Sequence, residues 1–472
     1  MCVTGQPWLG DACSLVDAFR DGELSPTEAL EGSLAAIEKS SLNAVCFMDE
    51  EKARQAAASA DVSLPFGGVP MGVKELDPVK GWPQTEASLV LKDRIAEYDG
   101  TMTSRLRSAG AVLVGQTTAS EFGGINCTYT RLHGATSNPY DLERTPGGSS
   151  GGSAASVSGG LFPICTGGDG GGSIRIPAGF TGLFGLKATF GRIPKGPHTE
   201  IEPLTAVIGC LSRSVRDTAR WYDVCNGYDE YDPYSLPRVE GWESGLGHQD
   251  VRGMRVAVCA DLGAAVIASA VREKVEEAAG FLVKDAELEQ VDVPMELPRG
   301  GLEWAMAGTA SLLVGLGDLY PACESEFTPE IMLAANIATN HFTIDTAKSI
   351  EEFRRTMIVQ VAQIFDQVDF IICATNPDVA FPAQGPMPTT IDGVDLISEL
   401  GFEAALGNNG ALTIPANTTG HPAVAIPIGL VDGQPVSMQI IGRRHAEQLL
   451  LELARVVELE RPWPLVAPGA PT

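Results

Sequence analysis

Two glycine-rich stretches decide how this chain is interpreted: TPGGSSGGS at residues 145–153 and DGGGSIRIP at residues 169–177. An apolar segment, LFPIC at 161–165, lies between them. The interval 147–173 holds 11 of the chain's 53 glycines. A flexible linker would not place a strand-like apolar segment between two glycine clusters. The clustering therefore indicates a local backbone device, because glycine allows turns and close approaches that other residues do not.

Three chemical interpretations fit such a segment. A phosphate-binding loop is disfavoured because no lysine follows the glycines at P-loop spacing. Two overlapping G-x-S-x-G patterns, centred on Ser149 and Ser150, match a nucleophile elbow. An elbow needs a strand directly before it, whereas residues 141–146 form a polar turn in the sequence pattern. The third interpretation is a nucleophile at Ser173, with an oxyanion hole made by the N–H groups of the glycines before it.

A serine nucleophile requires a base, because its hydroxyl is almost unreactive at neutral pH. Where no histidine supplies the base, a lysine that burial keeps neutral can do so. The segment GGVPMGVK at residues 67–74 predicts a turn that leads into a short strand ending at Lys74.

Apolar strands and amphipathic helices alternate over the rest of the chain, which favours an α/β fold around a central, largely buried sheet. Further strands are predicted at 111–115, 255–259, 370–373, 423–427 and 438–441. Helices are predicted at 103–109, 216–225, 271–283 and 446–460. Residues 226–250 predict a surface excursion, and residues 295–350 predict helices whose bulky apolar side chains cover a cleft.

Composition narrows the function classes. The net charge of −27 disfavours binding to nucleic acid or to an anionic membrane surface. No apolar run is long enough for a transmembrane helix. Ten scattered cysteines predict free thiols and a cytoplasmic location. None of the six histidines has metal-ligand spacing, so we expect neither a metal nor a cofactor.

The segment 145–193 resembles the signature block of the amidase signature family of serine hydrolases. The resemblance extends to residues 68–75, 132–139, 182–192 and 434–443, and so spans nearly the whole chain. It implies one large α/β amidase domain over residues 1–472, with a central mixed, twisted β-sheet covered by helices on both faces. Within it we expect an N-terminal helical region (1–62), a catalytic core (63–225), a variable substrate-pocket region (226–410) and C-terminal strands and helix (411–472).

The resemblance also implies a catalytic trio: Ser173 as nucleophile, Ser149 as bridging serine after a cis peptide bond, and Lys74 as base. Ser150 competes with Ser149 for the bridging role, but the 24-residue interval to Ser173 favours Ser149. The implied oxyanion hole consists of the backbone N–H groups of Gly170, Gly171 and Gly172. Asp169 and Arg175 are expected to pair and organise this loop, and Lys187 is expected to serve packing or charge balance.

The expected reaction is hydrolysis of small, uncharged aryl or alkyl amides through an acyl-enzyme, by a monomer or homodimer. Carbamate or ester hydrolysis by the same trio is the main alternative. An amidotransferase component that works on charged transfer RNA is less favoured, because of the acidic charge and because Ser120-Glu121-Phe122-Gly123 is closer to stand-alone amidases. A non-catalytic binding protein on this fold is disfavoured by the intact trio.

Overall fold

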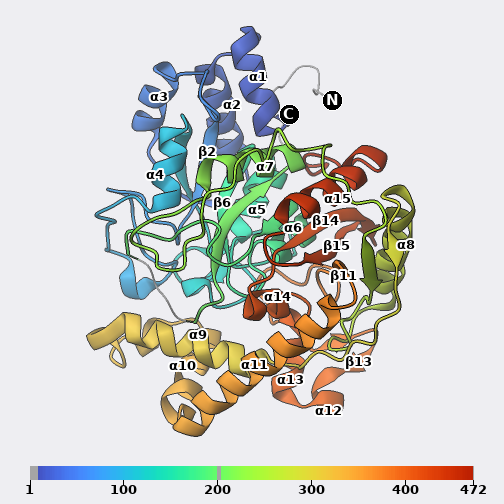
Figure 1. Cartoon of the computed structure of the whole chain (residues 1–472). Helices are drawn as coiled ribbons and strands as arrows, with labels where there is room; N and C mark the ends of the chain where they lie inside the picture. The colour runs from blue at the N-terminus through green and yellow to red at the C-terminus, as the bar shows by residue number, and fades with distance from the viewer. Residues whose placement is uncertain (1–8, 199–202, 471–472) are drawn as a thin grey trace.

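The computed structural model describes residues 9–198 and 203–470, and the description of the fold refers to them (Figure 1). Eleven strands form one mixed sheet. From one edge to the other these strands are β1 (Val45–Met48), β3 (Val112–Thr117), β2 (Pro70–Lys74), β6 (Ile164–Asp169), β8 (Val207–Ser212), β7 (Phe184–Lys187), β14 (Ala423–Val431), β15 (Gln434–Gly442), β11 (Phe370–Ala374), β9 (Arg255–Val258) and β10 (Glu289–Gln290). Two short hairpins stand apart, β4 (Tyr129–Thr130) with β5 (Gly134–Ala135) and β12 (Thr390–Ile391) with β13 (Val394–Asp395).

The predicted strands are present, with ends that differ by a few residues. The segment at residues 67–74 does form a strand that ends at Lys74. β2 runs parallel to both of its neighbours, β3 and β6. The carboxyl ends of parallel strands lie at the same edge of a sheet. Lys74 at the end of β2 and Asp169 at the end of β6 therefore lie on one edge.

Helices cover both faces of the sheet, as expected for this α/β fold. A large apolar cluster packs the sheet against α1, α4, α7, α8, α11 and α15, and a second cluster packs part of the sheet against α2, α3, α5 and α6. The helices are α1 (Ala12–Asp21), α2 (Pro26–Lys39), α3 (Glu50–Ala58), α4 (Thr101–Ser108), α5 (Gly151–Ser158), α6 (Arg175–Thr181), α7 (Val215–Cys225), α8 (Ser269–Asp285), α9 (Gly301–Leu316), α10 (Pro329–His341), α11 (Ile344–Phe365), α12 (Leu396–Leu400), α13 (Phe402–Gly407), α14 (Ile414–Thr419) and α15 (Glu447–Glu460).

In some of the buried strands, neighbouring residues enter different clusters, since successive side chains of a strand point to opposite faces. In β14, Val424 and Ile426 belong to the first cluster and Ala425 to the second. In β6, Ile164 belongs to the first and Cys165 to the second. Burial on both faces explains why these segments have continuous apolar sequences rather than alternating ones.

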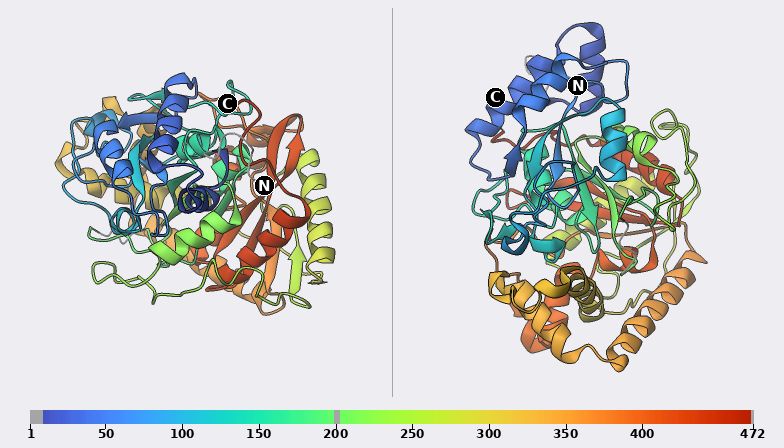
Figure 2. Two further views of the ribbon diagram at one scale, coloured as in Figure 1. Left: turned by 90° about the horizontal axis from the view of Figure 1, so that it is seen from above. Right: turned by 90° about the vertical axis from the view of Figure 1, so that its left-hand side faces the viewer.

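The helical segment predicted at 295–350 forms α9, α10 and the start of α11. These helices gather at one end of the molecule, opposite α1, α2 and α3 (Figures 1 and 2). Residues 226–250 contain neither helix nor strand, as predicted for a surface excursion, although Trp242 within them is buried.

Two further sequence expectations concern membranes and thiols. Across the described ranges, none of the helices has both the length and the apolar character needed to span a membrane. The nine cysteines in those ranges are free thiols, and Cys2 lies outside them.

Candidate active site

Lys74 and Ser149 are in direct contact. The Nζ atom of Lys74 lies 2.8 Å from Ser149 Oγ, and both side chains are buried. Burial lowers the pKa of Lys74 to about 8, against the opposing attraction of Asp77 and Asp169. With this pKa, roughly a tenth to a fifth of the lysine is neutral between about pH 7.0 and 7.4. A hydroxyl lies within hydrogen-bond reach of the neutral amine.

Ser150 is a second partner of the lysine. Its Oγ lies 2.9 Å from Lys74 Nζ and is also hydrogen-bonded to the backbone of Gly168, donating to the carbonyl at 3.2 Å and accepting from the N–H at 3.3 Å. Ser150 thus links the turn before α5 to strand β6. The backbone of Gly168 holds the hydroxyl of Ser150. Ser149 is therefore the better placed of the two serines to exchange a proton with Lys74.

The turn before α5 is not a nucleophile elbow. No strand precedes it directly, since residues 141–146 form turns and irregular backbone. The Gly148–Ser149 peptide bond is cis, as the resemblance implied. Gly147 adopts a φ of 90°, a conformation that strongly favours glycine. A side chain at Gly152 would meet the backbone N and O of Thr118 at 2.4 Å, so glycine lets α5 approach the end of β3.

Ser173 lies between β6 and α6, on the second glycine-rich stretch. It is half-buried, and its Oγ makes no hydrogen bond within the described residues, so no hydrogen bond joins it to Ser149. The structure therefore brings two of the three expected residues into hydrogen-bond contact. Ser173 follows the strand next to β2, at the sheet edge where β2 ends in Lys74.

The expected oxyanion hole needs one correction. The N–H of Gly172 donates to Asp169 Oδ1 at 2.8 Å, so it is not free to bind an oxyanion. In the described part of the chain, the N–H groups of Gly170, Gly171 and Ser173 have no hydrogen-bond acceptor. Sequence reasoning missed this because it depends on the carboxylate of Asp169 folding forward over the turn that follows it. The candidate donors are therefore Gly170, Gly171 and Ser173.

Asp169 and Arg175 form the ion pair that the sequence predicted, with both side chains fully buried. Two contacts join them, Nη2 to Oδ1 at 2.9 Å and Nε to Oδ2 at 3.0 Å. Burial alone would raise the pKa of Asp169, but the guanidinium and a hydrogen bond from Asn417 hold it at about 2. A charged, bidentate pair of this kind fixes the loop around Ser173.

The same loop is held from outside the signature block by residues that sequence reasoning missed. Thr413 Oγ1 donates to the carbonyl of Gly171 at 2.6 Å. Asn417, in α14, donates to both the backbone carbonyl and the carboxylate of Asp169. Trp304, in α9, donates through Nε1 to the carbonyl of Gly170 at 2.9 Å. Each contact joins segments far apart in the sequence, so no local spacing signals it.

Trp304 also packs against the glycines themselves. A Cβ built on Gly171 would lie 2.5 Å from the indole ring, whereas one on Gly170 would lie 3.7 Å from its nearest neighbour, Ala206. Glycine is therefore required for packing at position 171 and leaves spare room at position 170. This contact places α9 directly against the candidate oxyanion segment.

Comparison with known proteins gives the same family as the sequence motifs. A family model described as Amidase matches residues 28–451. A relative from Lactobacillus acidophilus, named as the A subunit of glutamyl-tRNA(Gln) amidotransferase, is 33% identical and covers 94% of this chain and 95% of its own.

Solved structures match the fold over almost all of the chain. A bacterial aryl acylamidase of the amidase signature enzymes superposes with a TM-score of 0.89 at 27% identity, over 96% of this chain and 97% of that one. The A subunit of the glutamyl-tRNA(Gln) amidotransferase of Thermotoga maritima gives a TM-score of 0.75 at 28% identity, over 93% of each chain. The family match, the mixed sheet and the signature block agree, and the chain belongs to the amidase signature family of enzymes that hydrolyse C–N bonds.

Proposed function

We propose that this protein hydrolyses small, uncharged aryl or alkyl amides through an acyl-enzyme on Ser173. The observation that carries the proposal is the 2.8 Å contact between buried Lys74 and Ser149. A lysine in hydrogen-bond contact with a hydroxyl, and with a pKa lowered by burial, is suited to act as a general base.

In the proposed reaction, neutral Lys74 accepts the proton of Ser149 while Ser149 accepts the proton of Ser173. The Ser173 oxygen attacks the carbonyl carbon, and the N–H groups of Gly170, Gly171 and Ser173 stabilise the resulting oxyanion. The protonated lysine returns its proton through Ser149 to the leaving amine, and the C–N bond breaks. Water then attacks the acyl-enzyme by the same route and releases the carboxylate.

The choice of small uncharged amides is supported by the apolar cover. Trp304 of α9 places its indole ring beside the candidate oxyanion segment. The closer fold match to an aryl acylamidase than to the transfer-RNA amidotransferase points the same way. Carbamates and esters remain alternatives, since attack on their carbonyl group uses the same three residues.

A second candidate function is that of an amidotransferase component, because the curated relatives carry that name. The net charge of −27 disfavours direct contact with transfer RNA. The two candidates differ in their amide substrate, so a substrate panel separates them.

The test is to assay the purified full chain on an aryl amide, an aliphatic amide, the matching carbamate and ester, and glutamine. We expect the aryl or aliphatic amide to be cleaved with the highest kcat/KM, and Ser173→Ala to abolish that activity. Glutamine as the best substrate would favour the amidotransferase function instead. No turnover on any member of the panel would contradict the proposal and favour a binding protein.

A further inference from the structure

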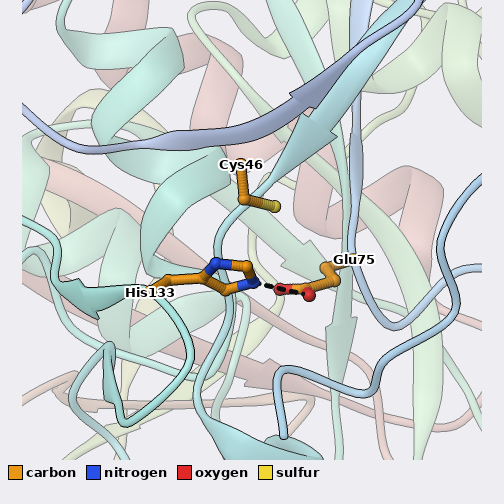
Figure 3. A group of neighbouring side chains, drawn as sticks. All are labelled: Cys46, Glu75 and His133. Carbon is orange, nitrogen blue, oxygen red and sulfur yellow. Dashed lines mark hydrogen bonds and ion pairs between the residues drawn. The ribbon is translucent and has the colours of Figure 1, made fainter. Parts of the chain in front are cut away.

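Three potential metal ligands from separate parts of the chain meet beside β2. Cys46 lies in β1, Glu75 directly follows β2, and His133 lies in the turn between β4 and β5. Figure 3 shows the three side chains pointing toward one another. One sulfur, one carboxylate oxygen and one ring nitrogen all lie within 4.8 Å of each other. The three residues are far apart in the sequence and meet only in the folded chain. Sequence spacing therefore gave no sign of a metal site.

The carboxylate of Glu75 is buried and only partly satisfied. Its side chain is 1% exposed. Oε1 accepts from Thr85 and lies 2.8 Å from His133 Nε2. Oε2 has no hydrogen-bond partner within the described residues. Leaving an oxygen of a buried carboxylate without a partner is unfavourable, and such an atom calls for an explanation such as an ion.

The thiol of Cys46 faces the same carboxylate. It makes a weak contact of 3.5 Å to the carbonyl of Gln116. The protonated thiol is only a weak hydrogen-bond donor to this carboxylate, whereas a bound cation would be held by the sulfur and the carboxylate together.

We propose that Cys46, Glu75 and His133 bind one divalent transition-metal ion of the zinc type. Thiolate, imidazole and carboxylate are the three ligand types that zinc uses in proteins. Binding releases the thiol proton to solvent, and the thiolate and carboxylate together then balance the two positive charges of the ion. The imidazole binds as the neutral ring, and water completes the four-coordinate shell.

An ion can reach the three side chains from solvent, and their spacing is close to that of zinc ligands. His133 is 20% exposed, so an ion can reach the site past its ring. A tetrahedral zinc ion holds its ligand atoms roughly 3–4 Å apart. The three side chains therefore need to approach one another only modestly.

This site is distinct from the proposed active site. Lys74 is the last residue of β2 and Glu75 directly follows it, and their side chains have different neighbours. Lys74 faces Ser149, whereas Glu75 faces His133. The ion would tie β1 and the β4–β5 turn to the end of β2 and stabilise the fold there. Metal binding at this site does not depend on the proposed function.

The test uses the full chain stripped of metal by a chelator and titrated with cobalt(II), with zinc as competitor. We expect one equivalent of cobalt to bind with a thiolate-to-cobalt charge-transfer band that zinc removes. Cys46→Ser should abolish the band, and His133→Gln should weaken binding by at least about tenfold. Zinc should raise the melting temperature of the parent protein and not that of Cys46→Ser.

Cys259→Ser is the matched control. Cys259 Sγ also lies beside a carboxylate, 3.5 Å from Asp261 Oδ1, but it is not part of the cluster. This variant should keep the band. A parent protein without the band, a band that survives in Cys46→Ser, or unchanged affinity in His133→Gln would overturn the proposal. The Glu75–His133 contact would then be an ordinary hydrogen bond.

Discussion

Lys74 and Lys187 are two buried lysines that each end a strand of the central sheet. Lys74 closes β2 and Lys187 closes β7. Burial lowers the pKa of both, to about 8 for Lys74 and to about 7 for Lys187. Their partners differ. Lys74 contacts the hydroxyls of two serines, whereas Lys187 donates to the backbone carbonyls of Ala188 and His421.

The difference shows that a lowered pKa alone does not make a catalytic lysine. A backbone carbonyl accepts a hydrogen bond but has no proton to give, so Lys187 can only hold two segments together. A serine hydroxyl both donates and accepts, so Lys74 has a neighbour that can pass a proton. In this comparison the proposed catalytic role follows from the partner rather than from burial.

Replacing each lysine separately should affect a different property: turnover for Lys74 and stability for Lys187. Lys74→Ala should lower kcat by roughly 10³- to 10⁴-fold, the upper range for loss of a general base. Lys187→Met should leave kcat nearly unchanged but lower the free energy of unfolding by about 1–3 kcal/mol, because two buried carbonyls lose their donor. Steady-state kinetics and denaturant unfolding of both variants check this. If Lys187→Met were as inactive as Lys74→Ala, the distinction between a catalytic and a structural lysine would be wrong.

The bridging role of Ser149 can be separated from burial of a hydroxyl in general. Ser149→Ala should lower kcat by about 10²- to 10³-fold, because the proton route from Ser173 to Lys74 is interrupted. Ser156→Ala is the matched control, since Ser156 lies buried in α5 and its Oγ has no partner among the described residues. It should retain normal turnover. Equal losses in both variants would indicate a packing defect rather than a lost proton route.

The two glycines of the candidate oxyanion segment should respond differently to the same added methyl group. Gly171→Ala should reduce kcat by on the order of 10²-fold, because the methyl collides with Trp304 and displaces the loop. Gly170→Ala should be tolerated, since its nearest neighbour is 3.7 Å away. Kinetics of both variants, and of Gly171→Ala combined with Trp304→Ala, measure the effect. If the added Trp304 substitution restores no activity, the collision is not the cause.

The pKa of Lys74 predicts the pH profile. The neutral amine is the active form, so kcat/KM should rise with pH and level off above about pH 8. Below that pH it should fall about tenfold per unit, as the fraction of neutral lysine falls. The profile should be measured in EDTA, so that no ion at Glu75 contributes. A flat profile between pH 6 and 8 would contradict lysine as the base.

The strands, the cis peptide bond and the Asp169–Arg175 pair could be predicted because each depends on neighbouring residues or on a long motif. The Lys74–Ser149 contact was implied by the family resemblance alone, because Ser149 lies in the turn before α5 and not at the end of a strand. The engagement of Gly172 N–H by Asp169 could not be predicted, because it depends on the curvature of a single turn. The contacts of Trp304 and Asn417 join segments that are far apart in the sequence. The cluster of Cys46, Glu75 and His133 joins three such segments. No rule based on residue spacing could predict either.

Ser173 is proposed here as a nucleophile that depends on Lys74 through Ser149. The most direct test of this dependence is covalent labelling with a fluorophosphonate, followed by mass spectrometry of the labelled peptide. We predict one adduct per chain, on Ser173, that forms far more slowly in Lys74→Ala and is absent in Ser173→Ala. An adduct on Ser149 or Ser150, or labelling that is equally fast in Lys74→Ala, would contradict the assignment.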